Sequence, residues 1–108
     1  MDKNDDLLKY ENITKDFDML TLSRGEPKKM KIRYNNPEDI DKHLVVESSD
    51  DIISVKDRDM ILEQKTSEYI RLTFHTPNTL GIYTSSVTVK DKNSGEIEEI
   101  LRFHIKVR

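Results

Sequence analysis

Residues 101–108 read LRFHIKVR and carry the clearest structural signal in the chain. Apolar residues occupy every second position, and basic residues or histidine occupy the positions between them. Successive side chains of a β-strand point to opposite faces, so this alternation predicts a strand with one buried face and one solvated face. The buried side is expected to consist of Leu101, Phe103, Ile105 and Val107.

The same two-residue period recurs upstream, over residues 29–34, 70–75 and 83–89. The turn-forming stretch 91–95 joins the last of these segments to the C-terminal strand, which predicts a hairpin. Short strands at a spacing of about ten residues favour a sandwich or a small barrel. We therefore predict an all-β, immunoglobulin-like β-sandwich of about seven antiparallel strands. Shorter apolar segments supply the remaining strands, at 17–22, 44–46, 52–55 and 60–62.

A chain of 108 residues has room for one domain. We place the sandwich at residues 17–108 and treat residues 1–16 as an N-terminal lead-in. This lead-in is expected to be either a short amphipathic helix or disordered. In the helical alternative Asn4 caps the helix, and its apolar residues are Leu7, Leu8, Tyr10 and Ile13.

Composition narrows the class of function. The 18 Lys and Arg residues and 21 Asp and Glu residues are interspersed and give a formal net charge of -3, so no overall field draws the chain to nucleic acid or an anionic membrane. No apolar run is long enough to span a membrane or to act as a secretory signal. The absence of cysteine excludes disulfides and suits a reducing compartment. We expect a cytoplasmic protein without nucleic-acid binding or membrane insertion.

Catalytic signatures do not occur in the sequence. It contains no nucleophile elbow, phosphate-binding loop or paired-glycine motif, so we expect no enzymatic activity. The histidines at 43, 75 and 104 fall at strand ends or on the solvated face of a strand, and spacing alone does not bring them together as metal ligands. No cofactor and no metal is therefore expected.

Carboxylates gather in segments that we expect to be loops, and carboxylate oxygens are the ligands that calcium prefers. A calcium-binding sandwich of this kind would bind lipid through the ion. Lysine and arginine residues interleave with the acids, however, and weaken the field that attracts a divalent cation. Solvated loop charge is the favoured interpretation, with calcium or lipid binding as the alternative. The acids are Asp50, Asp51, Asp57, Asp59 and Asp91.

The main basic concentration consists of Lys28, Lys29, Lys31 and Arg33, with Arg24 nearby. The two-residue period places Lys29, Lys31 and Arg33 on one exposed strand face. This face is the candidate site for acidic peptides or phosphates. No aromatic residues interleave with the cations, as binding of single-stranded nucleic acid requires. The favoured interpretation is that the cations keep an edge strand soluble, and partner binding by them is the sharpest functional alternative.

Leu80-Gly81-Ile82-Tyr83 resembles the tyrosine corner of immunoglobulin-like sandwiches, in which a tyrosine hydroxyl bonds back to upstream backbone. Three local motifs extend this likeness: Tyr34-Asn35-Asn36-Pro37 at a strand end, residues 70–77 with their apolar-x-apolar-x-Phe-x-x-Pro order, and Gly81 opening the next strand. Residues 17–107 as a whole resemble the major-sperm-protein (MSP) and ASH, or PapD-like, group of immunoglobulin-like domains.

Within this group, the acidic approach of residues 96–99 into the last strand resembles nephrocystin-4-type ciliary scaffold domains. The resemblance implies a non-enzymatic interaction domain of a larger ciliary or centrosomal scaffold. Its partners would be other ciliary or centrosomal proteins, and its location the cilium or the centrosome and basal body. Members at membrane contacts bind acidic peptides through a basic surface, for which Lys29, Lys31 and Arg33 are the candidates here.

Overall fold

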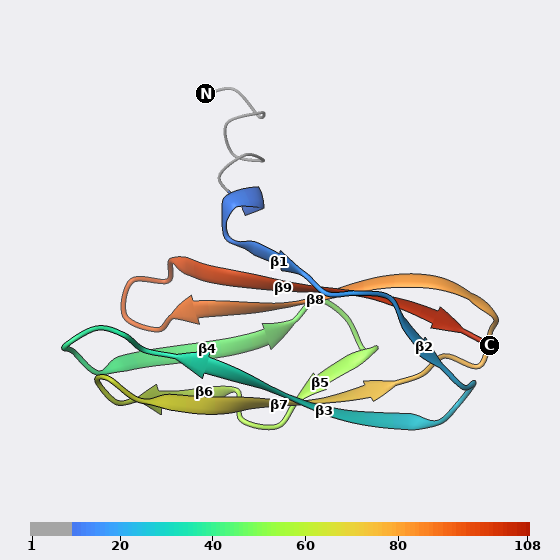
Figure 1. The fold of residues 1–108 in the computed structure, drawn as a ribbon, viewed down its shortest axis with the longest axis horizontal. Coiled ribbons are helices and arrows are strands. Elements are labelled where there is room, and N and C mark those ends of the chain that lie inside the picture. The colour runs from blue at the N-terminus through green and yellow to red at the C-terminus, as the bar shows by residue number, and fades with distance from the viewer. Residues whose placement is uncertain (1–9) are drawn as a thin grey trace.

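The computed structural model describes residues 10–108, which form two β-sheets packed face to face (Figure 1). The strands are β1 (Thr14–Asp16), β2 (Leu20–Leu22), β3 (Pro27–Asn35), β4 (Lys42–Ser48), β5 (Ile53–Val55), β6 (Asp59–Leu62), β7 (Ser67–His75), β8 (Gly81–Asp91) and β9 (Ile97–Val107). The larger sheet has the order β1-β9-β8-β4-β6, with β2 also paired to β9, and the smaller sheet has the order β3-β7-β5. The predicted all-β, immunoglobulin-like sandwich is confirmed.

The predicted hairpin forms the centre of the larger sheet. Strands β8 and β9 pair antiparallel from Gly81 opposite Val107 to Lys90 opposite Ile97, with an irregularity at Val89 and Lys90. In the turn, the Asp91 side chain accepts hydrogen bonds from the backbone N–H groups of Asn93 and Ser94, each 2.9 Å long. The turn chemistry expected from the sequence therefore closes the longest strand pair of the fold.

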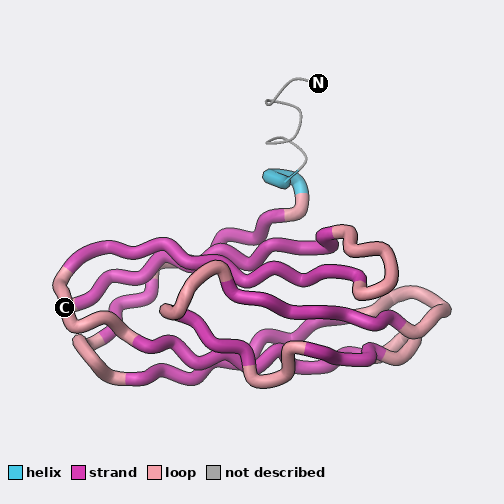
Figure 2. Tube along the Cα trace, turned by 180° about the vertical axis from the view of Figure 1, so that it is seen from behind, coloured by secondary structure: helices cyan, strands magenta, loops and turns pink. Residues whose placement is uncertain are grey.

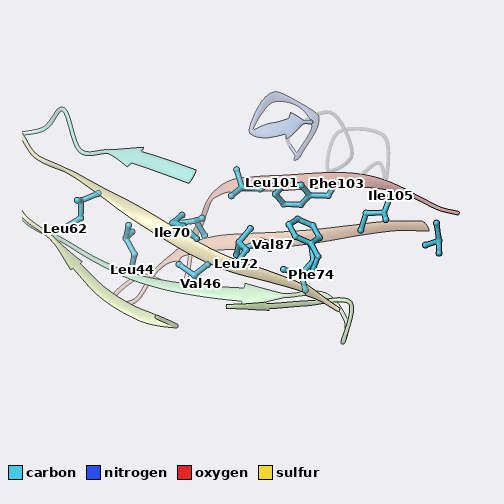
Figure 3. Packing of buried hydrophobic residues seen from close by; sticks show 13 residues of the cluster. Leu44, Val46, Leu62, Ile70, Leu72, Phe74, Val87, Leu101, Phe103 and Ile105 are labelled. Atoms are coloured by element: carbon cyan, nitrogen blue, oxygen red, sulfur yellow. The ribbon is translucent and has the colours of Figure 1, made fainter. Parts of the chain in front are cut away.

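The core lies between the two sheets and is built from the alternate apolar residues of the long strands (Figure 3). Leu101, Phe103, Ile105 and Val107 are each no more than 3% exposed, as the period predicted. The Phe103 ring stacks on Phe17 with a centroid separation of 4.5 Å and meets Phe74 of the smaller sheet edge-on at 5.2 Å. Aromatic packing thus joins the two sheets.

A buried asparagine fastens the end of β3 to the turn region between β6 and β7. Asn36 has no exposed surface, and its Nδ2 donates toward the carbonyls of Leu62 at 3.0 Å and Ile40 at 2.8 Å. Its Oδ1 accepts a hydrogen bond from the Glu38 backbone N–H. The motif 34–37 ends the strand as predicted, and Asn36 also carries a long-range contact that the motif did not indicate.

The sheet begins before the boundary expected from the sequence. Residues 14–16, which were assigned to the lead-in, form β1 and pair with β9, and both β1 and β2 run parallel to β9 rather than antiparallel. Segments of this length show no period, so neither pairing could be recognised. A short helical turn at residues 10–12 precedes β1 (Figure 2). The remaining residues of the predicted helix, Asn4, Leu7 and Leu8, lie outside the described residues.

An ion-pair network holds β1 against β9. Arg102 donates two hydrogen bonds to Asp16, of 2.7 and 2.8 Å, and His104 Nε2 lies 3.0 Å from the same carboxylate. The hydrogen bonds from Arg102 and from His104 hold the pKa of Asp16 well below its usual range. The short N-terminal strand is therefore fixed by charge as well as by backbone pairing.

The predicted tyrosine corner is confirmed. Tyr83 Oη donates a hydrogen bond of 2.8 Å to the carbonyl of Thr79, four residues upstream. This bond fixes the chain where it enters β8. No helix within residues 10–108 is long and apolar enough to cross a membrane.

Candidate partner-binding site

The outer surface of the smaller sheet carries the basic row found in the sequence. In β3, Met30, Ile32 and Tyr34 pack toward the core, so Lys29, Lys31 and Arg33 project outward and are exposed. The structure thus brings these candidate residues together on one face of one strand. Whether they bind a partner stays a prediction.

Two further cations join this row from neighbouring segments. Arg71 lies directly opposite Lys31 in the β3–β7 pairing. Lys56 follows β5 and donates its backbone N–H to the Arg71 carbonyl at 3.0 Å, which places it on the far side of β7. We use the name basic face for this surface, defined by Lys29, Lys31, Arg33, Lys56 and Arg71.

The centre of the basic face is hollowed. The residues that line the hollow are Lys29, Met30, Lys31, Ser54, Lys56, Arg71, Leu72 and Thr73. Sequence reasoning missed Lys56 and Arg71, because their place beside Lys31 depends on strand register. The outward parity of Arg71 in the 70–75 alternation was the one available signal.

The charges of the basic face are weakly compensated within the molecule. Lys31 Nζ lies 4.6 Å from the centroid of the Tyr69 ring, a cation–π contact that leaves its charge in place. The Arg71 guanidinium reaches Asp57 only at 3.8 Å. Within residues 10–108, Lys29, Lys31, Arg33 and Lys56 form no ion pair. The face therefore presents net positive charge to solvent.

On the inner side of β3, acidic side chains lie near one end of the strand, at Tyr34. Tyr34 is half-buried, and burial together with the nearby carboxylates of Glu98 and Glu99 raises its pKa. Burial likewise raises the pKa of Glu99, and Glu98 adds to this effect. Glu98 in turn binds Lys42, with Oε1 and Nζ 2.8 Å apart. Two acidic side chains thus lie near Tyr34, one of them paired with Lys42, while the cations of the basic face lie on the opposite side of β3.

Two of the acids expected in loops lie in strands instead, with Asp59 at the start of β6 and Asp91 at the end of β8, and three of the five acids bind donors of the protein. The hydrogen bond from Lys92, 2.9 Å long, lowers the pKa of Asp59, and the backbone N–H of Ser94 lowers that of Asp91. Asp50 Oδ1 accepts a hydrogen bond of 2.8 Å from the hydroxyl of Ser85. Within residues 10–108, no three His, Cys, Asp or Glu side chains are grouped to hold a metal ion. This geometry adds no support to the calcium alternative.

The three histidines have separate partners. His43 Nε2 lies 3.6 Å from Asp59, and His75 Nε2 lies 2.9 Å from the Ser54 hydroxyl. His104 contacts Asp16 in the network that fixes β1. The structure therefore does not bring the histidines together.

No protein-family model matches the sequence, and no curated protein matches it. Among solved structures, the ASH/PapD-like domain 7 of human CEP192 superposes with a TM-score of 0.58 at 15% identity, covering 89% of this chain and 80% of that one. The fold is that of the ASH/PapD-like and MSP domains. SSP-19, an MSP-domain protein of Caenorhabditis elegans, superposes with a TM-score of 0.54 at 8% identity, covering 82% of this chain and 92% of that one.

A similar β-sandwich also occurs inside larger proteins. A family 123 glycoside hydrolase from Clostridium perfringens superposes with a TM-score of 0.66 at 13% identity over 94% of this chain. The match covers only 25% of the hydrolase chain. At these identities the likeness concerns the fold alone.

Proposed function

We propose that this chain is a non-enzymatic protein-interaction domain of a larger scaffold protein, and that its basic face binds an acidic segment of a partner. The observation that carries the proposal is the cluster of exposed cations on the smaller sheet, which acids within residues 10–108 leave largely uncompensated. Such a surface attracts and orients a partner of opposite charge. Lys29, Lys31 and Arg33 are the residues expected to contribute most.

The parent scaffold is proposed to act at the cilium or at the centrosome and basal body. The sequence motifs resemble the MSP and ASH group, whose members occur in ciliary, centrosomal and membrane-contact proteins, with nephrocystin-4-type domains as the finer likeness. The fold shared with the ASH/PapD-like domain of CEP192 supports membership of that structural group. A membrane-contact location would use the same acidic ligand, so the site of accumulation in cells distinguishes the two.

The test is affinity capture from ciliated cells that express the tagged chain. We expect ciliary or centrosomal proteins to be enriched, and the enrichment to disappear in the variant Lys29→Glu, Lys31→Glu, Arg33→Glu. The matched control reverses three other exposed cations on the larger sheet and its flanking segments, Arg24, Lys106 and Arg108. This control should capture the same partners as the wild type. Recovery of no ciliary or centrosomal protein, or equal loss in both variants, would overturn the proposal.

A further inference from the structure

The free edge of β3 offers unpaired backbone along with the basic face. Within residues 10–108, β3 is 9 residues long and pairs only with β7. The other edge strands are much shorter, with 3 residues each in β1, β2 and β5 and 4 in β6. Short edges resist pairing with foreign strands, whereas a long edge is a template for it. Within residues 10–108, β3 is thus the longest strand that forms a sheet edge along its whole length.

Hydrogen bonds of the smaller sheet show which β3 residues face this edge. The Arg71 carbonyl accepts from Lys56 N–H at 3.0 Å, and His75 N–H donates to the Ile52 carbonyl at 2.7 Å, so the odd-numbered residues of β7 bond toward β5. In an antiparallel ladder successive residues bond to opposite sides, so the even-numbered residues of β7 bond toward β3. Asn36 N–H donates to the Thr66 carbonyl at 2.8 Å in this register.

The even-numbered residues of β3 are therefore the ones bonded to β7. The backbone N–H and C=O groups of Lys29, Lys31, Arg33 and Asn35 point toward the open edge. Three of these residues also supply outward side chains of the basic face. Edge hydrogen-bonding capacity and positive charge thus coincide at the same positions.

We infer that the β3 edge binds a β-strand of a partner protein by strand addition, and that this strand carries acidic residues at alternate positions with apolar residues between them. The inference deepens the proposed function and rests on it. Backbone hydrogen bonds to Lys29, Lys31 and Arg33 set the register, and acidic side chains on the outer surface lie beside the three cations. Charge complementarity thus favours partner strands with acidic residues at the outer positions.

The inner positions of the added strand require apolar residues. They lie beside Met30, Ile32 and Tyr34, which are half-buried and pack against the core. An acid at the inner position next to Tyr34 would lose hydration beside half-buried apolar side chains and would approach the acidic side chain of Glu99. The two sides of β3 therefore favour opposite chemistry, which makes the alternation of the partner strand part of its recognition.

A second copy of this chain is a poor occupant of the same edge. Pairing β3 with another β3 would set the two basic rows side by side, and like charges across a strand pair are destabilising. The cations that guard the edge against self-association are thus the ones that select an acidic strand. The sequence left two roles open for Lys29, Lys31 and Arg33, namely keeping an edge strand soluble and binding a partner. Both roles are compatible on this edge.

The test uses synthetic peptides with three glutamates alternating with valines, titrated onto the whole chain by calorimetry. A peptide of the same composition with its glutamates contiguous should bind at least about tenfold more weakly, because only the alternating one keeps acids outside and valines inside. N-methylation of the peptide groups that face β3 should abolish binding, while N-methylation of the opposite groups should leave it unchanged. On binding, the amides of Lys29, Lys31 and Arg33 should become protected from exchange.

Variants of the chain separate this inference from the proposed function. Reversal of Lys29, Lys31 and Arg33 should remove binding, and reversal of Arg24, Lys106 and Arg108 should preserve it, with folding checked by circular dichroism. Equal binding of both peptides, insensitive to N-methylation yet lost on reversal of the β3 cations, would overturn strand addition and leave the acidic-partner proposal standing. Absence of binding by every peptide would also overturn strand addition, and capture from cells would then judge the proposed function separately.

Discussion

The two sheets use their charged residues differently. In the larger sheet cations meet acids of the same protein: Arg102 binds Asp16 at 2.7 Å, Lys90 binds Glu47 at 3.3 Å and Lys42 binds Glu98 at 2.8 Å. In the smaller sheet Lys29, Lys31 and Arg33 stand in a row with no ion pair within residues 10–108. Several ion pairs thus link strands of the larger sheet, whereas the three β3 cations are the ones that we propose to bind a partner.

The edges of the sheets differ in the same sense. Those of the larger sheet are formed by strands of 3 or 4 residues, whereas the smaller sheet has one short edge, the 3 residues of β5, and one long edge, the 9 residues of β3. We therefore expect the stability of the fold and the proposed partner binding to depend on different residues. Changes to the shared core should damage both sheets, and changes to the basic face should leave stability intact.

The largest expected effect is a loss of stability on substitution in the core. Core substitutions in either sheet should cost a similar unfolding free energy. Phe103 of the larger sheet and Phe74 of the smaller one are both fully buried and pack edge-on at 5.2 Å. Replacing either by alanine should lower the free energy of unfolding by about 3–5 kcal/mol, because each leaves a cavity. Urea denaturation measures this, with the exposed Ile82→Ala as control. A loss below about 1.5 kcal/mol for one of them would show that the sheets do not share a core.

The next effect tests what anchors the open strand. Asn36→Ala removes the amide that binds the Leu62 and Ile40 carbonyls at the end of β3, and should cost about 2–3 kcal/mol of unfolding free energy because buried backbone groups lose their partners. Asn35→Ala, an exposed neighbour, is the control and should cost far less. Equal losses in thermal or urea unfolding would contradict the role of Asn36 as an anchor.

A smaller effect is expected at the entry to the central hairpin of the larger sheet. Tyr83→Phe deletes the hydroxyl that donates to the Thr79 carbonyl at 2.8 Å and keeps the ring, so unfolding free energy should fall by about 1 kcal/mol. Chemical denaturation with both proteins side by side gives the difference. An unchanged denaturation midpoint would show that the hydrogen bond of the tyrosine corner does not stabilise the fold.

The smallest expected effect is a pH-dependent change in melting temperature, which tests the role of the ion pairs in the larger sheet. The pKa of Asp16 is lowered by Arg102 and His104, so its ionised form stabilises the folded state above the ordinary aspartate pKa of about 4, and this contribution is lost as pH falls further. The melting temperature of Asp16→Asn should therefore lie below that of the wild type at neutral pH, and the gap should close in acid. The neutral substitution Lys31→Gln, which adds no carboxylate, should produce no such gap in the acid range. A gap that persists at the lowest pH would contradict the account of Asp16.

Much of the fold follows from the alternation of apolar residues in the long strands. The period placed Leu101 and Phe103 inward and Lys29 and Lys31 outward, because a buried face and a two-residue repeat together determine side-chain direction. Tyr83 was recognised because its corner is a local motif, with donor and acceptor only four residues apart. Local signals were thus sufficient for the faces of the long strands and for this turn.

The missing parts depend on contacts between segments distant in sequence. Asn36 bonds to Leu62, 26 residues away, and no local pattern indicates that bond. Lys56 and Arg71 complete the basic face only through the register of β5, β7 and β3. The parallel pairing of residues 14–16 with β9 has the same cause, since so short a segment shows no period. Which strands lie side by side was therefore the information that the sequence did not reveal.

Hydrogen exchange along β3, followed by NMR on the chain without any partner, tests the central claim most directly. We predict alternation: the amides of Met30, Ile32 and Tyr34 exchange slowly because they bond to β7, and those of Lys29, Lys31 and Arg33 exchange fast at an open edge. Equal protection of both sets would mean that the edge is already covered, and would contradict the claim that β3 is the open, basic strand on which a partner docks.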